Sequence, residues 1–411
     1  MKYLILIGDG MGDRPLPQLN GKTVLQAART PAMDTLCKDA TLLRLKTIPD
    51  GFPPGSEIAN MSLLGYDPAR FFTGRAPLEA ASMGVDLTPT QTAYRCNLVT
   101  MDWTTGAQPT LVDFSAELIA TDEAAQLIEA LQRECGDERF TFYPGVGYRH
   151  LLVVDDTVPA IDTVAPHDHM GKDITTPWQV YQQEPTWAEL LHTASAVIAD
   201  HPINHRRIRR GLRPANAIWP WGSGKMPAMP TLTERFGITG TMISAVDLLK
   251  GLGVLAGLDA PTIPGATGYI DTNYEGKANA ALDALSHQDF AYVHLEAPDE
   301  AGHQANVEHK IMAVEDFDAR IVAPIVKTLT QRGEPFRLVV TMDHFTPIEL
   351  RTHTDEPVPA LLYDSGKPAN GSQHGFHEAL RHDDDTPLTF LAGHELLPYL
   401  VGHPDADPSS S

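Results

Sequence analysis

Short apolar runs, each closed by turn-forming or polar residues, recur along this chain. Runs of this length and composition are typical of buried strands. They occur at residues 3–7, 290–295, 338–341 and 360–363. Apolar positions at helical spacing separate them, as in the stretch that begins at Ser56. This alternation predicts an α/β core in which helices flank a central, mostly parallel sheet.

The middle of the chain has a different pattern of apolar and polar residues. Two strands and two amphipathic helices are predicted there, at residues 93–101, 150–154, 122–134 and 185–198. We therefore expect residues 86–217 to form an inserted α+β cap domain, and residues 1–85 and 218–411 to form the core. The last residues, 404–411, are polar and rich in proline and serine, so we expect them to be disordered.

Composition and charge narrow the class of protein. With 411 residues, 42% of them hydrophobic and 20% charged, the chain can bury a large core. The net charge of −22 argues against nucleic acid and acidic membranes as partners. The apolar start at residues 3–7 is too short to span a membrane and lacks a basic leader. A cytoplasmic protein is expected.

Ser56 stands at the start of a predicted helix, directly after Pro53, Pro54 and Gly55. A serine at that position can serve as an N-cap, because its side-chain oxygen accepts a free backbone N–H. It can also serve as a nucleophile, because a helix N-terminus favours negative charge and binds phosphate. The local sequence allows both interpretations.

Six further polar residues lie near predicted strands: five follow a strand, where ligands of open α/β sheets gather, and His353 precedes the apolar run at residues 360–363. They are Asp9, Asp299, His303, Asp343, His344 and His353. Asp299 and His303 are four residues apart and would share one helical face. Mixed carboxylate and imidazole donors suit Mn²⁺ or Zn²⁺ better than Ca²⁺ or Mg²⁺. Together with Ser56, these residues predict a site for two metal ions with a serine nucleophile in it.

Nearly the whole chain resembles one family. The segments GDGMGDRP, TPAMD, PGSEIANMSLLGYDP, TGRAPLEAASMGVDL, GATGYIDTNYEGKA, DEAGH and THTDEPVP look like blocks of the cofactor-independent phosphoglycerate mutases of archaeal type, in family order. That family belongs to the alkaline phosphatase superfamily. The resemblance implies an alkaline-phosphatase-like core, an inserted cap over the metal site, and two divalent ions. Mn²⁺ is expected, with Zn²⁺, Co²⁺ or Mg²⁺ as alternatives, and no nucleotide is needed.

The resemblance also implies how the residues divide between the two ions. One ion would be held by Asp9, Ser56, Asp343 and His344, and the other by Asp299, His303 and His353. Ser56 would carry the phosphoryl group while the substrate, a small phosphorylated carboxylate, reorients. The expected reaction is the interconversion of 3-phosphoglycerate and 2-phosphoglycerate without 2,3-bisphosphoglycerate.

In so acidic a chain, an anionic substrate has to be attracted locally. The candidates for substrate binding are Arg75, Arg149, His150, His167 and Lys225. Guanidinium groups match phosphate and carboxylate bidentately, which favours the two arginines. The basic segment 205–214 is either a solvated helix face or a further anion-binding element.

One departure from the archaeal pattern keeps alternatives open. The segment LVDFSAELIATDEA, residues 111–124, is acidic where archaeal members carry arginines. This resembles a bacterial branch proposed to act as homoserine kinase, so a kinase-like phosphotransferase is one alternative and a metal-dependent phosphatase another. The chain has no GxxxxGK[ST] motif and no kinase-type glycine loop, which favours the mutase.

Overall fold

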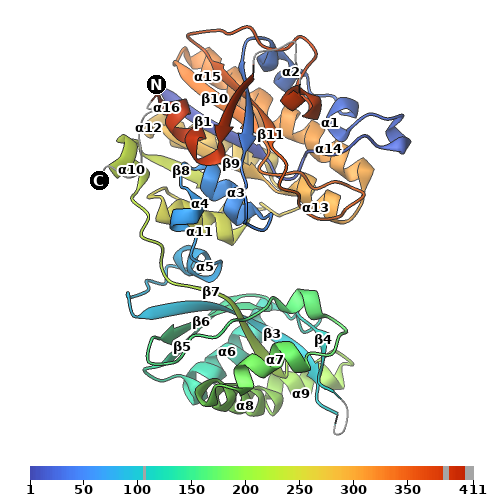
Figure 1. Ribbon diagram of the computed structural model, residues 1–411, viewed down its shortest axis with the longest axis vertical. Coiled ribbons are helices and arrows are strands. Elements are labelled where there is room, and N and C mark those ends of the chain that lie inside the picture. Colours follow the sequence, from blue (N-terminus) through green and yellow to red (C-terminus); the bar gives the residue numbers. More distant parts are fainter. Residues whose placement is uncertain (105–107, 383–387, 403–411) are drawn as a thin grey trace. The chain divides into compact units, whose positions relative to one another are not determined.

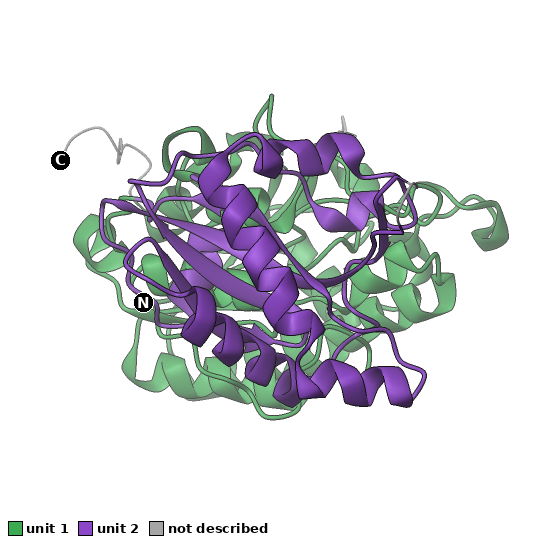
Figure 2. Ribbon diagram, turned by 90° about the horizontal axis from the view of Figure 1, so that it is seen from below, with its two compact units in different colours: residues 1–72, 228–411 green, residues 73–227 purple. Residues whose placement is uncertain are grey.

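The computed structural model describes residues 1–104, 108–382 and 388–402; the tail predicted to be disordered, 404–411, lies outside these ranges. The chain divides into two compact units (Figure 2). Unit 1 comprises Met1–Phe72 and Ala228–Ser411, and unit 2 comprises Thr73–Pro227. Among the described residues, no helix is both long and apolar enough to cross a membrane.

Unit 1 is built on a sheet of seven strands in the order β12-β2-β11-β10-β1-β9-β8 (Figure 1). The strands are β1 (Lys2–Gly8), β2 (Thr41–Lys46), β8 (Gly240–Ile243), β9 (Phe290–Leu295), β10 (Phe336–Thr341), β11 (Val358–Asp364) and β12 (Leu388–Ala392). Only β11 runs antiparallel to its neighbours in this sheet, β10 and β2. The predicted α/β class with a mostly parallel sheet is confirmed, and each of the four predicted strands of this unit is present.

The apolar runs form strands because both faces of the central sheet are covered. Leu4 to Ile7 in β1 are fully buried, and so is every residue of β9. Helices pack on the sheet in two groups. The first group is α1 (Val24–Ala27), α2 (Pro31–Lys38), α12 (Tyr274–His287), α14 (Val307–Phe317) and α15 (Ala323–Arg332). The second is α3 (Ser56–Leu63), α11 (Asp247–Leu255) and α16 (Leu396–Val401).

Three other α-helices complete the described part of unit 1: α4 (Pro68–Phe71), α10 (Leu232–Phe236) and α13 (Ala297–His303). The last of these matters most for the site, because α13 starts directly after β9. A strand followed at once by a helix carries polar residues of the helix to the carboxyl end of the sheet.

Unit 2 has an antiparallel sheet with the order β4-β3-β6-β5, and β7 pairs with the other side of β3. The strands are β3 (Gln91–Asp102), β4 (Thr110–Asp113), β5 (Phe140–Val146), β6 (Arg149–Asp155) and β7 (Ala217–Gly224). The helices are α5 (Ala76–Ser82), α6 (Thr121–Cys135), α7 (Thr175–Gln182), α8 (Pro185–Ala199) and α9 (Pro202–Arg209). The two strands and two helices predicted for this part of the chain are all present.

The limits of unit 2 extend beyond the predicted cap on both sides. Helix α5 and strand β7 belong to unit 2. The boundaries between the units in the sequence are therefore 72/73 and 227/228, where 85/86 and 217/218 were expected. The physical reason lies in pairing: β7 hydrogen-bonds along β3, from Val99↔Ala217 to Ala93↔Gly224. That pairing joins strands more than a hundred residues apart, and local pattern does not reveal it.

Candidate functional site

The candidate site lies at the carboxyl ends of the central strands of unit 1. β1 pairs with β9 on one side and β10 on the other, with Ile7 opposite both His294 and Thr341. The residues that follow these three strands therefore meet at one edge. Asp9 follows β1, α13 with Asp299 and His303 follows β9, and Asp343 with His344 follows β10.

The first cluster joins Asp9, Ser56, Asp343 and His344. Nε2 of His344 lies 3.2 Å from Oγ of Ser56. The same nitrogen lies 3.5 Å from Oδ1 of Asp9 and 3.5 Å from Oδ2 of Asp343. Asp9, Asp343 and His344 are buried. Four donor atoms of three chemical types thus converge in a space from which most water is excluded.

The second cluster joins Asp299, His303 and His353. Oδ2 of Asp299 lies 3.2 Å from Nε2 of His303, and Oδ1 lies 3.4 Å from Nε2 of His353. The two imidazole Nε2 atoms are 2.9 Å apart. The Nδ1 atoms lie against backbone carbonyls, 3.0 Å from Arg351 O and 3.4 Å from Pro54 O, which orients both rings with Nε2 inward.

The two clusters adjoin each other. The rings of His344 and His353 stack with centroids 4.0 Å apart. The hydroxyl of Thr346 donates to Oδ1 of Asp299 and lies 3.3 Å from Nδ1 of His344. All seven residues predicted for the metal site and its nucleophile are therefore brought together within unit 1.

The electrostatics of the site favour the binding of a cation. Burial and the neighbouring carboxylates of Asp343 and Asp299 raise the pKa of Asp9 well above its usual range. Despite burial, the imidazoles of His303 and His353 hold the pKa of Asp299 well below its usual range. The Asp299 carboxylate in turn raises the pKa of His303 to about 9. Carboxylates crowded in this way repel one another until a cation compensates them.

The donor atoms fit divalent metal ions. In a tetrahedral site with metal–ligand bonds of about 2.1 Å, neighbouring donor atoms lie about 3.4 Å apart. The separations above run from 2.9 to 3.5 Å, close to that spacing. Two groups of three donor atoms close enough to hold a metal ion are Asp299, His344 and His353, and Asp9, His294 and Asp343. This grouping differs from the predicted division, because His344 joins the second cluster and the unpredicted His294 joins Asp9 and Asp343.

The position of Ser56 separates the two interpretations of that residue. Gly55 is the N-cap of α3, and no side chain caps this helix end. Ser56 is the first helical residue, and its hydroxyl faces His344 instead of a backbone N–H. The capping interpretation is therefore wrong, and the role of Ser56 as nucleophile stays a prediction.

Two residues that sequence reasoning missed support this arrangement. Asn60 is fully buried, one helical turn beyond Ser56, and its amide donates to Ser56 O (2.8 Å) and to Asp343 Oδ2 (2.9 Å). Tyr292 donates to Asn60 Oδ1 at 2.5 Å. The i, i+4 spacing of Ser56 and Asn60 was the available signal, because a polar residue there shares the helix face of the serine.

The residues predicted to bind substrate lie in unit 2, and some of them gather around Trp221. The guanidinium of Arg75 lies 5.9 Å from the Trp221 ring, and the ring of His167 lies 5.4 Å from it. Arg95, which the sequence analysis did not single out, stacks on Trp221 at 4.3 Å and pairs with Glu79 at 3.1 Å. Burial, and also the charges of Arg75 and Arg149, lower the pKa of Arg95. This part of unit 2 is thus rich in positive charge.

His150 and Lys225 are differently placed. His150 is buried, its Nδ1 accepts the backbone N–H of Gly145 at 3.0 Å, and burial lowers its pKa to about 3. The Lys225 ammonium lies 2.5 Å from the Asp156 carboxylate. Lys225 and Nδ1 of His150 therefore already have partners within unit 2, whereas Nε2 of His150 is buried with no hydrogen-bond partner among the described residues.

The acidic segment 111–124 and the basic segment 205–214 pair with each other. Arg207 is buried and lies 2.6 Å from Glu123, and Arg213 lies 3.1 Å from Asp113. Arg207 also donates to the backbone carbonyls of Ala116 and Arg213. The basic segment is thus tied to the acidic segment instead of being fully solvated.

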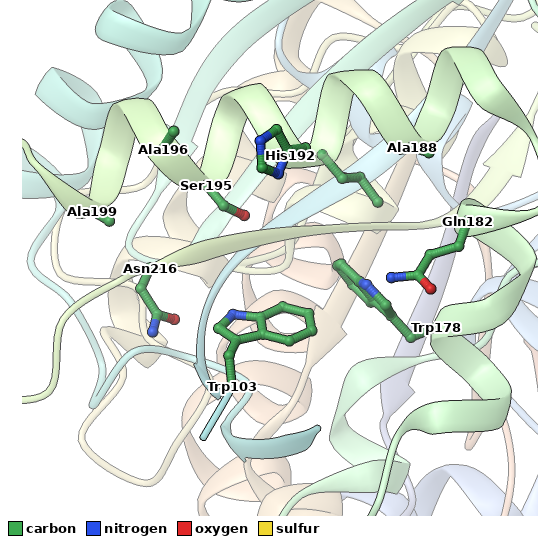
Figure 3. A pocket seen from close by; sticks show the side chains of 10 residues that line it. Trp103, Trp178, Gln182, Ala188, His192, Ser195, Ala196, Ala199 and Asn216 are labelled. Atoms are coloured by element: carbon green, nitrogen blue, oxygen red, sulfur yellow. The ribbon is translucent and has the colours of Figure 1, made fainter. Parts of the chain in front are cut away.

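A pocket of about 600 Å³ in unit 2 contains none of the predicted substrate residues (Figure 3). Its walls include Trp103, Trp178, Gln182, His192 and Asn216. The side-chain amide of Asn216 is already paired with the backbone of Met101. The pocket is mainly apolar and is separate from the charged surroundings of Trp221.

Comparisons with known proteins agree on one family. A model described as 2,3-bisphosphoglycerate-independent phosphoglycerate mutase matches residues 38–204. A probable 2,3-bisphosphoglycerate-independent phosphoglycerate mutase of Geobacter sulfurreducens is 50% identical over 92% of this chain and 94% of the relative. The mutase of that name from Methanosarcina barkeri is also 50% identical, with the same coverage.

Two solved structures are similar to this chain over nearly its whole length. A protein from Pyrococcus horikoshii, 28% identical, has a TM-score of 0.81 and covers 100% of this chain and 99% of its own. The cofactor-independent phosphoglycerate mutase from Thermoplasma acidophilum, 27% identical, has a TM-score of 0.65 and covers 98% of this chain and 99% of its own.

Proposed function

Because this chain belongs to the 2,3-bisphosphoglycerate-independent phosphoglycerate mutase family, we propose that it interconverts 3-phosphoglycerate and 2-phosphoglycerate through a phosphoryl group held on Ser56. The observation that carries this proposal is the position of the Ser56 hydroxyl, 3.2 Å from Nε2 of His344 among metal-ligand donors and unused as a helix cap. The cytoplasmic location stays a prediction.

Two divalent ions, with Mn²⁺ as our expectation, would be held by the residues of the two clusters. Asp9, Ser56, Asp343 and His344 would hold one, and Asp299, His303 and His353 the other. When bound, such ions neutralise the oxygens of a transferring phosphoryl group and lower the pKa of a serine hydroxyl. No nucleotide is needed for that chemistry.

The chain's own residues orient the nucleophile. Asn60 bonds both the backbone of Ser56 and the side chain of Asp343, so the serine and one carboxylate are fixed together. The N-terminus of α3 adds backbone N–H groups and a favourable dipole for negative charge on the hydroxyl oxygen. In the proposed cycle, Ser56 takes the phosphoryl group from one hydroxyl of glycerate and returns it to the other.

We propose that the substrate's anionic groups are held by arginines of unit 2. The support is the concentration of Arg75, Arg95 and Arg149 in a chain whose net charge is −22. Replacing Arg75 or Arg149 by alanine should raise KM, by about 2 kcal/mol or more of lost binding, while metal content stays unchanged. Arg139→Ala is the matched control, because Arg139 is exposed and pairs with Asp137 in the same unit. An equal rise in KM for the control would count against the assignment.

The kinase alternative loses its main sequence argument. The acidic segment that set this chain apart from archaeal members pairs with the basic segment through Glu123–Arg207 and Asp113–Arg213. A structural pairing accounts for the acidic residues without any change of substrate. We therefore favour the mutase over the homoserine kinase and over the phosphatase.

The deciding experiment is product analysis with purified protein and added Mn²⁺. We expect 2-phosphoglycerate from 3-phosphoglycerate, followed through enolase, with neither nucleotide nor 2,3-bisphosphoglycerate added. A labelled phosphoryl group should stay on its original glycerate skeleton. Free phosphate as the main product would favour the phosphatase, and ATP-dependent phosphorylation of homoserine without mutase turnover would favour the kinase.

A further inference from the structure

His294 is a fully buried histidine to which the proposed reaction assigns no role. It is the penultimate residue of β9 and lies opposite Ile7, two residues before Asp9. Its Nε2 is 3.4 Å from Oδ2 of Asp9 and 3.8 Å from Oδ2 of Asp343. Side chains alternate along a strand, so His294 shares its face with Tyr292, which bonds Asn60.

The other ring nitrogen of His294 lies against an anchored carboxylate. Nδ1 is 3.5 Å from Oε1 of Glu296, which accepts the Ser244 hydroxyl (2.8 Å) and the Ala245 N–H (2.7 Å). Glu296 also forms a buried ion pair with Lys277, whose ammonium donates to the backbone carbonyl of His294 at 2.9 Å. Burial raises the pKa of Glu296, but Lys277 and His294 outweigh it and hold the pKa well below the usual range.

This imidazole is therefore placed between carboxylates on both sides. Among the described residues, neither of its nitrogens has a hydrogen-bond partner, and these three carboxylates lie within 3.4 to 3.8 Å of them. A buried polar ring costs free energy unless its surroundings compensate it. We therefore look for the role of this histidine in its interaction with the carboxylates around it. Asp9 and Asp343 arrive from different strands and repel each other, and a group that touches both can hold them in one arrangement.

We propose that His294 positions Asp9 and Asp343 for the metal ion that these carboxylates share with Ser56 and His344, with Glu296 and Lys277 as its anchor. The inference rests on the metal pair of the proposed function. It makes His294 a positioning residue that acts through the ligands. Groups that orient metal ligands from outside the coordination shell typically change metal affinity about 10-fold to 100-fold when they are removed.

The test titrates Mn²⁺ alone into chelator-stripped, full-length protein by calorimetry, so that its outcome does not depend on which reaction the enzyme catalyses. In His294→Leu we expect one of two Mn²⁺ sites to weaken about 10-fold to 100-fold and the other to keep its affinity. His294→Gln keeps an amide donor beside the carboxylates and should recover part of the loss. Glu296→Gln, which leaves His294 in place without its anchor, should weaken the same site.

A control separates positioning from a general loss of stability. Asp318 is also buried in unit 1, where it accepts the backbone N–H groups of Ala32 and Met33, away from both clusters. Asp318→Asn should lower the melting temperature without changing either Mn²⁺ affinity. The absorption spectrum of bound Co²⁺ should change in His294→Leu and stay that of the wild type in Asp318→Asn, because only the former alters the geometry around the ion.

The outcomes that overturn the inference are distinct. If both Mn²⁺ sites of His294→Leu keep their wild-type affinities, the positioning role is refuted and the proposed function is unaffected. Loss of one whole Mn²⁺ ion in His294→Leu, with no rescue in His294→Gln, makes His294 a ligand instead. A wild-type protein that binds no Mn²⁺ removes the metal pair itself, and with it both proposals.

Discussion

Replacing Ser56 by alanine tests the centre of the proposed mechanism. Removing a nucleophile would lower the catalytic rate, whereas removing a helix cap would lower folding stability. A capping serine would cost about 1 kcal/mol of folding stability when removed and leave activity intact. The structure gives Ser56 no capping bond, so the expected change in stability is within about 0.5 kcal/mol. Loss of a nucleophile lowers kcat by a factor on the order of 10⁴ to 10⁶, or about 5 to 8 kcal/mol of transition-state stabilisation.

The measurement compares three proteins loaded with Mn²⁺ by the enolase-coupled rate and by thermal unfolding. Ser62→Ala is the matched control, because Ser62 lies on the same helix, is fully buried, and its Oγ has no hydrogen-bond partner among the described residues. We expect wild-type turnover in Ser62→Ala and almost none in Ser56→Ala, with similar melting temperatures. A kcat within tenfold of wild type in Ser56→Ala would refute the nucleophile.

Three further predictions follow from charges buried in the structure. Removing metal with a chelator should abolish activity and lower the melting temperature, and Mn²⁺ should restore both; an ion present at about 100 times its Kd contributes about 2.7 kcal/mol of stability, so unchanged melting would contradict the metal pair. Arg207→Leu should destabilise the protein by about 3 to 5 kcal/mol, because Glu123 would keep only Arg210, at 3.9 Å, and the carbonyls of Ala116 and Arg213 would lose their donor. KM should stay that of wild type, and a raised KM would assign the basic segment to substrate binding. Burial raises the pKa of Glu378 to about 7, so the contribution of Glu378 to stability is full below the unfolded pKa of about 4.3 and is lost as pH rises through about 7. Glu378→Gln should remove that pH dependence. If the free energies of unfolding of wild type and variant change in parallel from pH 4.5 to 8, the prediction is wrong.

The sequence by itself determined the elements and the chemistry of the site. The apolar runs specify strands β1, β9, β10 and β11, because a strand covered on both faces has to be apolar along its length. Polar residues directly after such strands stand at the carboxyl edge of the sheet whatever the strand order is. That is why Asp9, Asp299 and Asp343 were candidates for one site before the strand order was known, whereas the division of ligands between two ions came from the family resemblance.

Tertiary structure alone decided which of these residues have which partners. Strand β1 lies between β9 and β10, and this order brings Asp9 next to His294 and His344, which are 285 and 335 positions away. No local periodicity encodes that order, because it depends on which faces of helices and strands fit together. Ser56 likewise became distinguishable from a cap only when its hydroxyl was found beside His344.

The residues that sequence reasoning missed have the same explanation. His294 stands in an apolar strand and has the pattern of a core residue, and only the fold places it between Asp9 and Glu296. His150 and Lys225 stay predicted substrate residues, and only the fold shows that Nδ1 of His150 accepts the Gly145 N–H and that Lys225 pairs with Asp156. Residue type and local spacing specify what a side chain can do, whereas the neighbours that burial and strand pairing bring to it decide what it does.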